Sequence, residues 1–124
     1  MSVKHDKNIH TSVLLSELVE AIEVYKDKKN VIVDCTLGLA GHAEKIIEKL
    51  HTGDIFIGID ADERNLKLAA KRLEATVQKQ TQNPTSWETP SGVKIVLLHT
   101  NFQELQSSLE KIGIDTITGI YYDL

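Results

Sequence analysis

The stretch that decides the fold is residues 31–42, which read VIVDCTLGLAGH. It begins with a short run rich in β-branched residues, and this run ends on a carboxylate, Asp34. A turn containing Gly38 and Gly41 follows, and an apolar-periodic segment comes after it. A strand that leads through a glycine-rich turn into a helix is how α/β proteins build a nucleotide pocket at the carboxyl edge of a parallel sheet. On its own the turn is equally consistent with tight packing of the strand against the helix.

Apolar patterns in the rest of the chain predict a continued alternation of strands and helices. Strands are expected at 31–34, 55–59, 93–98 and 117–122, and helices at about 12–24, 43–50, 62–77 and 105–112. The strands are apolar on both faces, which is typical of a parallel sheet that is covered on both sides. The sequence therefore predicts an α/β fold with a Rossmann-like half sheet.

Length and composition exclude several classes of protein. The 124 residues suffice for one domain, and no apolar run approaches the roughly 20 residues that cross a bilayer. The single cysteine, Cys35, excludes an internal disulfide and favours a reducing, cytoplasmic location. A net charge of -4 and an aromatic content of 5% provide neither a basic footprint nor a stacking surface for a nucleic acid within this chain.

A polar stretch at 76–92 separates the second and third predicted strands. It is rich in Gln, Thr and Ser and contains both prolines. Its composition predicts a surface loop, longer than the usual connection of about 4–6 residues. We interpret Trp87, its only large apolar residue, as an anchor packed against the body of the domain rather than a platform for base stacking.

Asp60 is the strongest candidate for ligand binding. It closes the second predicted strand and follows Gly41 by 19 residues, close to the ~20-residue interval of the dinucleotide fingerprint. A carboxylate there can accept hydrogen bonds from both hydroxyls of a ribose, so the pattern favours a cofactor that contains adenosine. The alternative is that Asp60 caps the following helix. Asp62 is better placed for that capping role, which would leave Asp60 free.

Other polar or aromatic residues follow the remaining predicted strands. Asp34 and Asp123 end the first and fourth strands, which should be neighbours, so both acids are expected at the crevice between them. After the third strand, Phe102 is either a core residue at the start of a helix or a ring that packs against an adenine. We expect His42 to form a pocket wall.

No metal site and no catalytic residue can be assigned from the pattern. The five histidines show no i, i+4 pair and no clustered spacing with the cysteine. Cys35 is expected to pack as a small apolar group. No pair of residues can be recognised in the sequence as a nucleophile and its base.

Five segments occur in the order of one known family, namely 10–15 (HTSVLL), 34–42 (DCTLGLAGH), 58–62 (GIDAD), 101–102 (NF) and 119–124 (GIYYDL). They resemble the bacterial MraW/RsmH family of S-adenosylmethionine-dependent methyltransferases, which methylate N4 of a cytidine in small-subunit ribosomal RNA. The resemblance covers the chain apart from 76–92. It implies a class I methyltransferase half sheet with strand order 3-2-1-4, S-adenosylmethionine as cofactor and ribosomal RNA as partner.

The resemblance also implies roles for particular residues. The methionine end of the cofactor would lie over Ala40, Gly41 and His42. Asp60 would bind the ribose, Phe102 would flank the adenine, and Asp123 would close the pocket. Asp34 would have a supporting role near the methionine amino group.

Three features depart from the family pattern. Ala40 replaces the first glycine of a Gly-Gly-His triplet, and the 76–92 loop is longer than usual. The family also continues beyond the position of Leu124, with further strands and an inserted helical substrate domain. We therefore expect residues 1–124 to be a partial, truncated cofactor-binding domain that lacks the substrate-recognition domain and is inactive alone, with its fourth strand as an unprotected edge.

Two alternatives remain. One is a fragment of an NAD-dependent oxidoreductase, although the turn at 38–42 lacks the full GxGxxG spacing. The other is a cofactor-binding remnant without catalytic activity.

Overall fold

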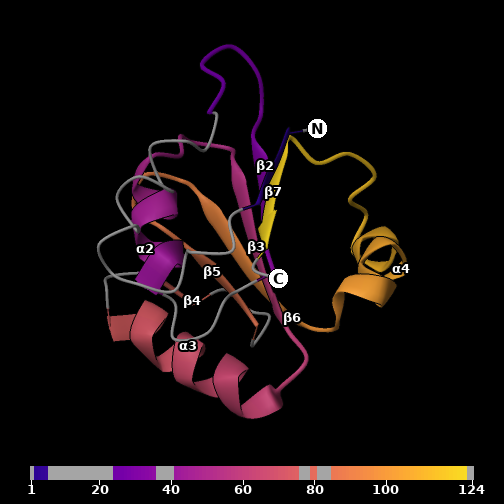
Figure 1. Cartoon of the computed structure of the whole chain (residues 1–124). Helices are drawn as coiled ribbons and strands as arrows, with labels where there is room; N and C mark the ends of the chain where they lie inside the picture. The colour runs from indigo at the N-terminus through magenta and orange to yellow at the C-terminus, as the bar shows by residue number, and fades with distance from the viewer. Residues whose placement is uncertain (1, 6–23, 36–40, 76–78, 81–84, 123–124) are drawn as a thin grey trace.

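The computed structural model of the chain describes residues 2–5, 24–35, 41–75, 79–80 and 85–122 (Figure 1). Its elements are β1 (Ser2–His5), β2 (Val31–Asp34), α2 (Gly41–Glu48), β3 (Ile55–Asp60), α3 (Glu63–Ala75), β4 (Lys79–Gln80), β5 (Ser86–Glu88), β6 (Lys94–His99), the 3₁₀ helix η1 (Phe102–Glu104), α4 (Leu105–Lys111) and β7 (Gly119–Tyr122). The helix expected at 12–24 lies outside the described residues apart from Val24, and so do Ala40 and Asp123.

One sheet contains all of these strands, in the order β1-β7-β2-β3-β6-β5-β4. The strands from β1 to β6 in this order pair in parallel, whereas β5 and β4 are antiparallel. The four strands expected from the sequence are β2, β3, β6 and β7, and they lie in the predicted order 3-2-1-4. The Rossmann-like half sheet is therefore confirmed.

Apolar cores cover both faces of the sheet, because successive side chains of a strand point to opposite sides. Ile32 and Phe56 face a core completed by α2 and α3. Val33 and Ile57 face a second core, completed by α4. Figure 1 shows α2 and α3 on one side of the sheet and α4 on the other. The two-sided burial that the apolar strands predicted is thus present.

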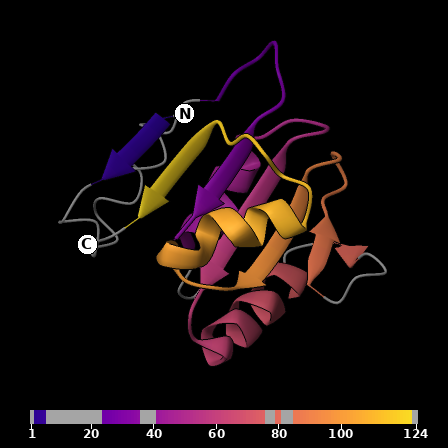
Figure 2. The same ribbon diagram turned by 90° about the vertical axis from the view of Figure 1, so that its right-hand side faces the viewer.

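The edge beyond β7 differs from the expectation. β7 was expected to be an unprotected edge, but β1 pairs with it in parallel, Ser2 opposite Gly119 and His5 opposite Tyr122 (Figure 2). The prediction failed because the sequence of β1, SVKH, carries little apolar signal, and its pairing depends on a strand more than 110 residues away.

The described residues of the segment at 76–92 are not all loop. The segment contains β4 and β5, and β5 pairs with β6 through a tight turn in which Gly92 donates its N–H to the Thr89 carbonyl over 2.9 Å. Gly92 has φ +92, a conformation that favours glycine. Trp87 lies on β5 and is 1% exposed, so its interpretation as an anchor is confirmed, while the surface-loop prediction is wrong for the residues of β4 and β5.

The helix residues named below, which were predicted to face the core, are buried with one exception. Ala43 and Ile46 of α2, Leu73 of α3, and Leu105 of α4 are buried. Ile112 was expected on the same face as Leu105 but is 41% exposed, because α4 ends at Lys111 and the chain turns away there.

Candidate functional site

The carboxyl ends of the parallel strands meet along one edge of the sheet. Asp34 of β2 is in register with Gly58 of β3 on one side and Tyr121 of β7 on the other. The chain leaves β2 for helices on one face of the sheet, whereas it reaches β7 from α4 on the opposite face (Figure 1). The boundary between β2 and β7 is therefore the topological switch point, where α/β sheets bind ligands.

Asp60 is the last residue of β3 and is half-buried at this edge. Its Oδ1 accepts the N–H of Asp62 over 2.8 Å, and its Oδ2 accepts Nδ2 of Asn65 over 3.2 Å. The expectation that Asp60 is free was therefore wrong, because the start of the following helix holds its carboxylate. An ionised carboxylate has about four acceptor positions, so each oxygen of Asp60 retains one that no described residue fills.

Asp62 caps α3, as its position before the helix predicted. Its Oδ1 accepts the Arg64 N–H over 2.9 Å, and its Oδ2 lies 3.0 Å from the Arg64 guanidinium. The hydrogen bonds from Arg64 lower the pKa of Asp62. The first turn of α3 thus has its own cap, independent of Asp60.

His99 was given no role from the sequence, yet it is part of this edge. It is in register with Asp60, and its Nε2 lies 2.9 Å from the Ala61 carbonyl. This contact ties the end of β6 to the turn after β3. No spacing rule links residue 99 to residue 60, and only the strand register brings them together.

Phe102 lies just beyond the end of β6, at the same edge. Asn101 caps the 3₁₀ helix by accepting the Glu104 N–H, and the Phe102 side chain is 56% exposed. The alternative that Phe102 is a core residue is therefore wrong, although it does begin a helix. Its ring lines a groove of about 370 Å³ between α4 and β7, together with Leu105, Ile117 and Ile120.

Asp34 and Cys35 lie side by side where β2 ends. Asp34 is fully buried, and Cys35 packs against the α4-side core. Burial and the neighbouring charge of Asp34 raise the pKa of the Cys35 thiol to about 12. The thiol therefore stays protonated near neutral pH, in agreement with the prediction that it packs as a small apolar group.

The remaining predicted site residues are only partly described. Gly41 and His42 are the first two residues of α2, so the backbone at 41–42 lies at the start of the helix that follows β2. Ala40 and Asp123 fall outside the described residues. The structure thus brings Asp34, Asp60 and Phe102 to one edge of the sheet.

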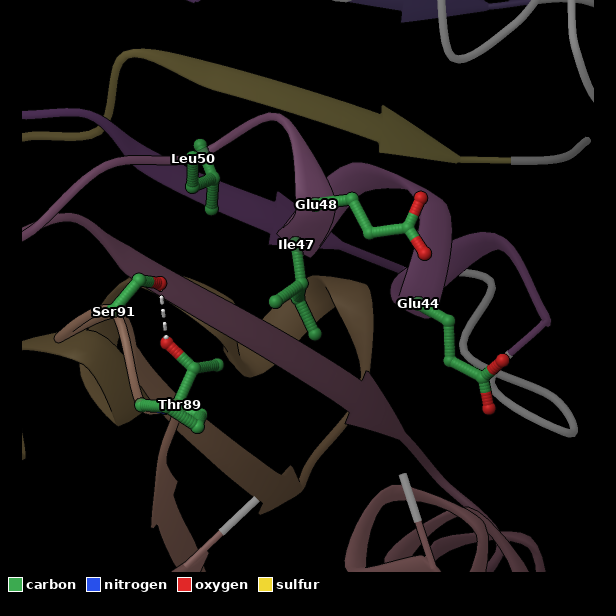
Figure 3. Close-up of a pocket in the computed structure, with 7 residues that line it drawn as sticks. Glu44, Ile47, Glu48, Leu50, Thr89 and Ser91 are labelled. Atoms are coloured by element: carbon green, nitrogen blue, oxygen red, sulfur yellow. Dashed lines mark hydrogen bonds between the residues drawn. The ribbon is translucent and has the colours of Figure 1, made fainter. Parts of the chain in front are cut away.

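A hollow of about 230 Å³ lies at the opposite edge (Figure 3). Glu44, Ile47 and Glu48 of α2 line one side, and Thr89 and Ser91 of the β5–β6 turn line the other. Leu50 lies shortly before β3, and the turn lies shortly before β6. The hollow is therefore at the amino ends of these strands. It is separate from the predicted site.

The described residues also bear on metal binding and on membrane spanning. Within them, no group of three or more His, Cys, Asp and Glu side chains is placed to hold a metal ion. In the same part of the chain, no helix has the length and apolar character needed to cross a membrane.

Comparisons with known proteins agree with this geometry. The sequence profile described as the MraW methylase family matches residues 7–124. The ribosomal RNA small subunit methyltransferase H of Clostridioides difficile strain 630 is 39% identical over 93% of this chain, and that of Clostridium botulinum strain Hall is 36% identical over 93%. The matched regions are 32% and 31% of these relatives, so the chain spans about a third of their length. The match favours a methyltransferase over the NAD-dependent alternative. On the extent of the profile match, the chain belongs to the MraW methylase family.

Proposed function

We propose that residues 1–124 form the cofactor-binding part of an S-adenosylmethionine-dependent methyltransferase that acts on N4 of a cytidine in small-subunit ribosomal RNA. The observation that carries the proposal is Asp60. Its half-buried carboxylate is held at the carboxyl end of β3 with one acceptor position left on each oxygen. Two such positions match the two hydroxyls of a ribose.

The other residues at this edge fit the rest of the cofactor. The exposed ring of Phe102 offers an apolar face for the adenine, and the start of α2 at Gly41 and His42 offers backbone donors for the methionine carboxylate. We assign Ala40 to the same methionine-binding turn, Asp123 to the wall of the pocket, and buried Asp34 to a supporting role near the amino group. When bound, the cofactor supplies an electrophilic methyl group on its sulfonium.

In this proposal, the chain contributes binding and orientation. Methyl transfer requires the donor and the acceptor to be in line, and residues that fix the ribose and the adenine fix the direction of the methyl group. Asp60 would do so as a bidentate acceptor, and Phe102 by stacking. The catalytic residue that prepares the cytosine amine stays unassigned.

We further propose that most of the RNA surface lies in the part of the relatives that this chain does not match. The net charge of -4 supports this division, because RNA-binding surfaces are rich in Lys and Arg. A cytoplasmic location is part of the proposal, since ribosomal RNA is the substrate.

The test of cofactor binding is a calorimetric titration of the full chain with S-adenosylhomocysteine and, separately, with NAD. We expect binding of S-adenosylhomocysteine and none of NAD. A folded chain that prefers NAD would refute the proposal.

The test of the division between cofactor and RNA surfaces is an activity assay with small ribosomal subunits and labelled S-adenosylmethionine. We expect no transfer by this chain alone. Formation of N4-methylcytidine would show that the acceptor site is within residues 1–124, whereas cofactor binding without transfer is also what a non-catalytic remnant would give.

A further inference from the structure

Asn65 is placed to hold the orientation of the Asp60 carboxylate. It is the third residue of α3 and is half-buried. Its side-chain Nδ2 donates to Oδ2 of Asp60 over 3.2 Å, while the Asp62 N–H donates to Oδ1 over 2.8 Å. One donor therefore holds each oxygen, and the two together restrict rotation of the carboxylate about its last side-chain bond.

The consequence of this restriction is a fixed direction for the two acceptor positions that remain. A free carboxylate must lose rotational freedom when it binds a ribose, and a carboxylate that is already oriented loses less. The Asp62 donor is a backbone group, so side-chain substitutions leave it in place. Asn65 provides the side-chain half of the arrangement.

We propose that Asn65 is a positioning residue that orients Asp60 to accept both ribose hydroxyls of the cofactor. This rests on the proposed function, in which Asp60 binds the ribose. Asn65 itself has no contact with the ligand in this arrangement and acts through Asp60.

Substitution of Asn65 is expected to preserve the fold. The cap of α3 comes from Asp62, whose side chain binds Arg64, and the Asn65 N–H bonds to the Asp62 carbonyl through its backbone. Alanine also has a higher helix propensity than asparagine. Asn65→Ala thus removes the donor to Asp60 and little else.

The first experiment is a calorimetric comparison of two ligands, S-adenosylhomocysteine and its 2′,3′-dideoxy analogue, with the full chain. Asn65→Ala is expected to bind S-adenosylhomocysteine about fivefold more weakly than the unmodified chain, because one oriented hydrogen-bond acceptor is worth about 1 kcal/mol. Binding of the dideoxy analogue should not change. Lys71→Ala, at an exposed position of the same helix, is the matched control and should change neither affinity.

The second experiment uses Asn65→Asp and a pH profile. Near pH 8 the introduced carboxylate repels Asp60, so binding of S-adenosylhomocysteine should be weaker than in Asn65→Ala. Once the pH is low enough to protonate the introduced carboxyl, that group becomes a donor to Asp60, so the affinity should recover. Asn65→Ala cannot show this recovery.

Other charged groups near Asp60 are the same in both variants. Asp62 and Arg64 form an ion pair on α3, and His99 of β6 lies near Glu63 and Lys67 along one hollow. His99 is present in both variants, so comparing Asn65→Asp with Asn65→Ala at each pH isolates the contribution of the introduced carboxyl.

The outcomes separate this inference from the proposed function. Failure of the unmodified, folded chain to bind S-adenosylhomocysteine refutes the proposed function. Normal binding by Asn65→Ala, or an equal loss for both ligands, refutes the role of Asn65 alone. If the dideoxy analogue binds too weakly to measure, the pH profile decides, and a profile for Asn65→Asp that parallels Asn65→Ala refutes the role.

Discussion

Two aspartates at opposite ends of β3 perform different tasks. Asp54, just before the strand, is 3% exposed and accepts the N–H of Asn30, the Asn30 side-chain amide and the N–H of His51. Asp60, the last residue of the strand, is half-buried, and its carboxylate accepts only two hydrogen bonds from the described residues. The comparison teaches that the number of donors around a carboxylate decides whether it joins parts of the chain or remains able to bind a ligand.

Removal of the Asp54 carboxylate should have the largest effect on stability. Asp54→Ala leaves three donors without their acceptor, two of them buried and the His51 N–H partly buried, so we expect a loss of about 3 kcal/mol in the free energy of unfolding. The measurement is urea unfolding followed by the fluorescence of Trp87, the only tryptophan and a buried one. Asp27→Ala, at an exposed position, is the control and should stay within about 0.5 kcal/mol. An equal loss of stability in Asp54→Ala and Asp27→Ala would contradict the structural role of the buried Asp54 carboxylate.

Removal of the Asp60 carboxylate should affect binding instead. Asp60→Ala is expected to weaken the binding of S-adenosylhomocysteine about 100-fold, because two hydrogen bonds to a charged group are lost. The free energy of unfolding should fall by less than about 1 kcal/mol, because this end of β3 is open to solvent and Asp62 still caps α3. Calorimetry on the same samples used for unfolding checks both values. A large loss of stability with unchanged affinity would reverse the roles of the two aspartates.

The turn at the amino edge offers a second way to test that this edge is structural. Gly92→Ala should lower stability by about 2 kcal/mol, because φ is +92 and the added Cβ would lie 2.9 Å from Cγ2 of Thr52. Gly53→Ala is the matched control, with φ +90 and no atom within 4 Å of the added Cβ, and should lose about 1 kcal/mol. The affinity for S-adenosylhomocysteine should be unchanged in both variants. Weaker binding in either variant would contradict the conclusion that the amino edge plays no part in ligand binding.

Cys35 should produce the smallest effect, and only at high pH. The folded pKa of about 12 lies above the ordinary value of 9.0, so the folded state retains a proton that the unfolded state releases between these values. Stability linked to this thiol is therefore complete below pH 9 and decreases as the pH rises toward 12. Between pH 8 and pH 10 the free energy of unfolding of the unmodified chain should fall by roughly 1 kcal/mol more than that of Cys35→Ala. The figure is below the full linkage value because the side chain is only partly buried. Identical pH profiles would contradict the raised pKa.

The sequence predicted the parts of the fold that depend on local patterns. Four strands and the buried faces of α2 and α3 follow from apolar periodicity, which each segment carries by itself, whereas the strand order was implied by the family resemblance. The strands β1, β4 and β5 were missed because their composition is polar and their stability comes from partners elsewhere. For β5 a signal was present, since Pro90 and Gly92 mark a tight turn between Trp87 and the next strand.

The candidate site was predicted to a similar degree. The positions of Asp34, Asp60 and Phe102 at the carboxyl edge follow from strand ends, which the sequence marks. The hydrogen bonds of Asp60 with Asn65, and the place of His99 beside the same turn, depend on helix geometry and strand register. Asn30 was not singled out from the sequence, yet its side chain is fully buried against Asp54.

By itself, the sequence determined the parallel half sheet, its covering helices and the edge at which the candidate site residues gather, because each segment carries its own apolar periodicity and its own strand-ending acid. Only the tertiary structure decided which acid is enclosed and which retains acceptor positions. Asp54 and Asp60 have the same chemistry and flank the same strand. The donors that distinguish them come from Asn30 and His51 at one end and from the first turn of α3 at the other, and hydrogen bonding depends on where those donors lie in space.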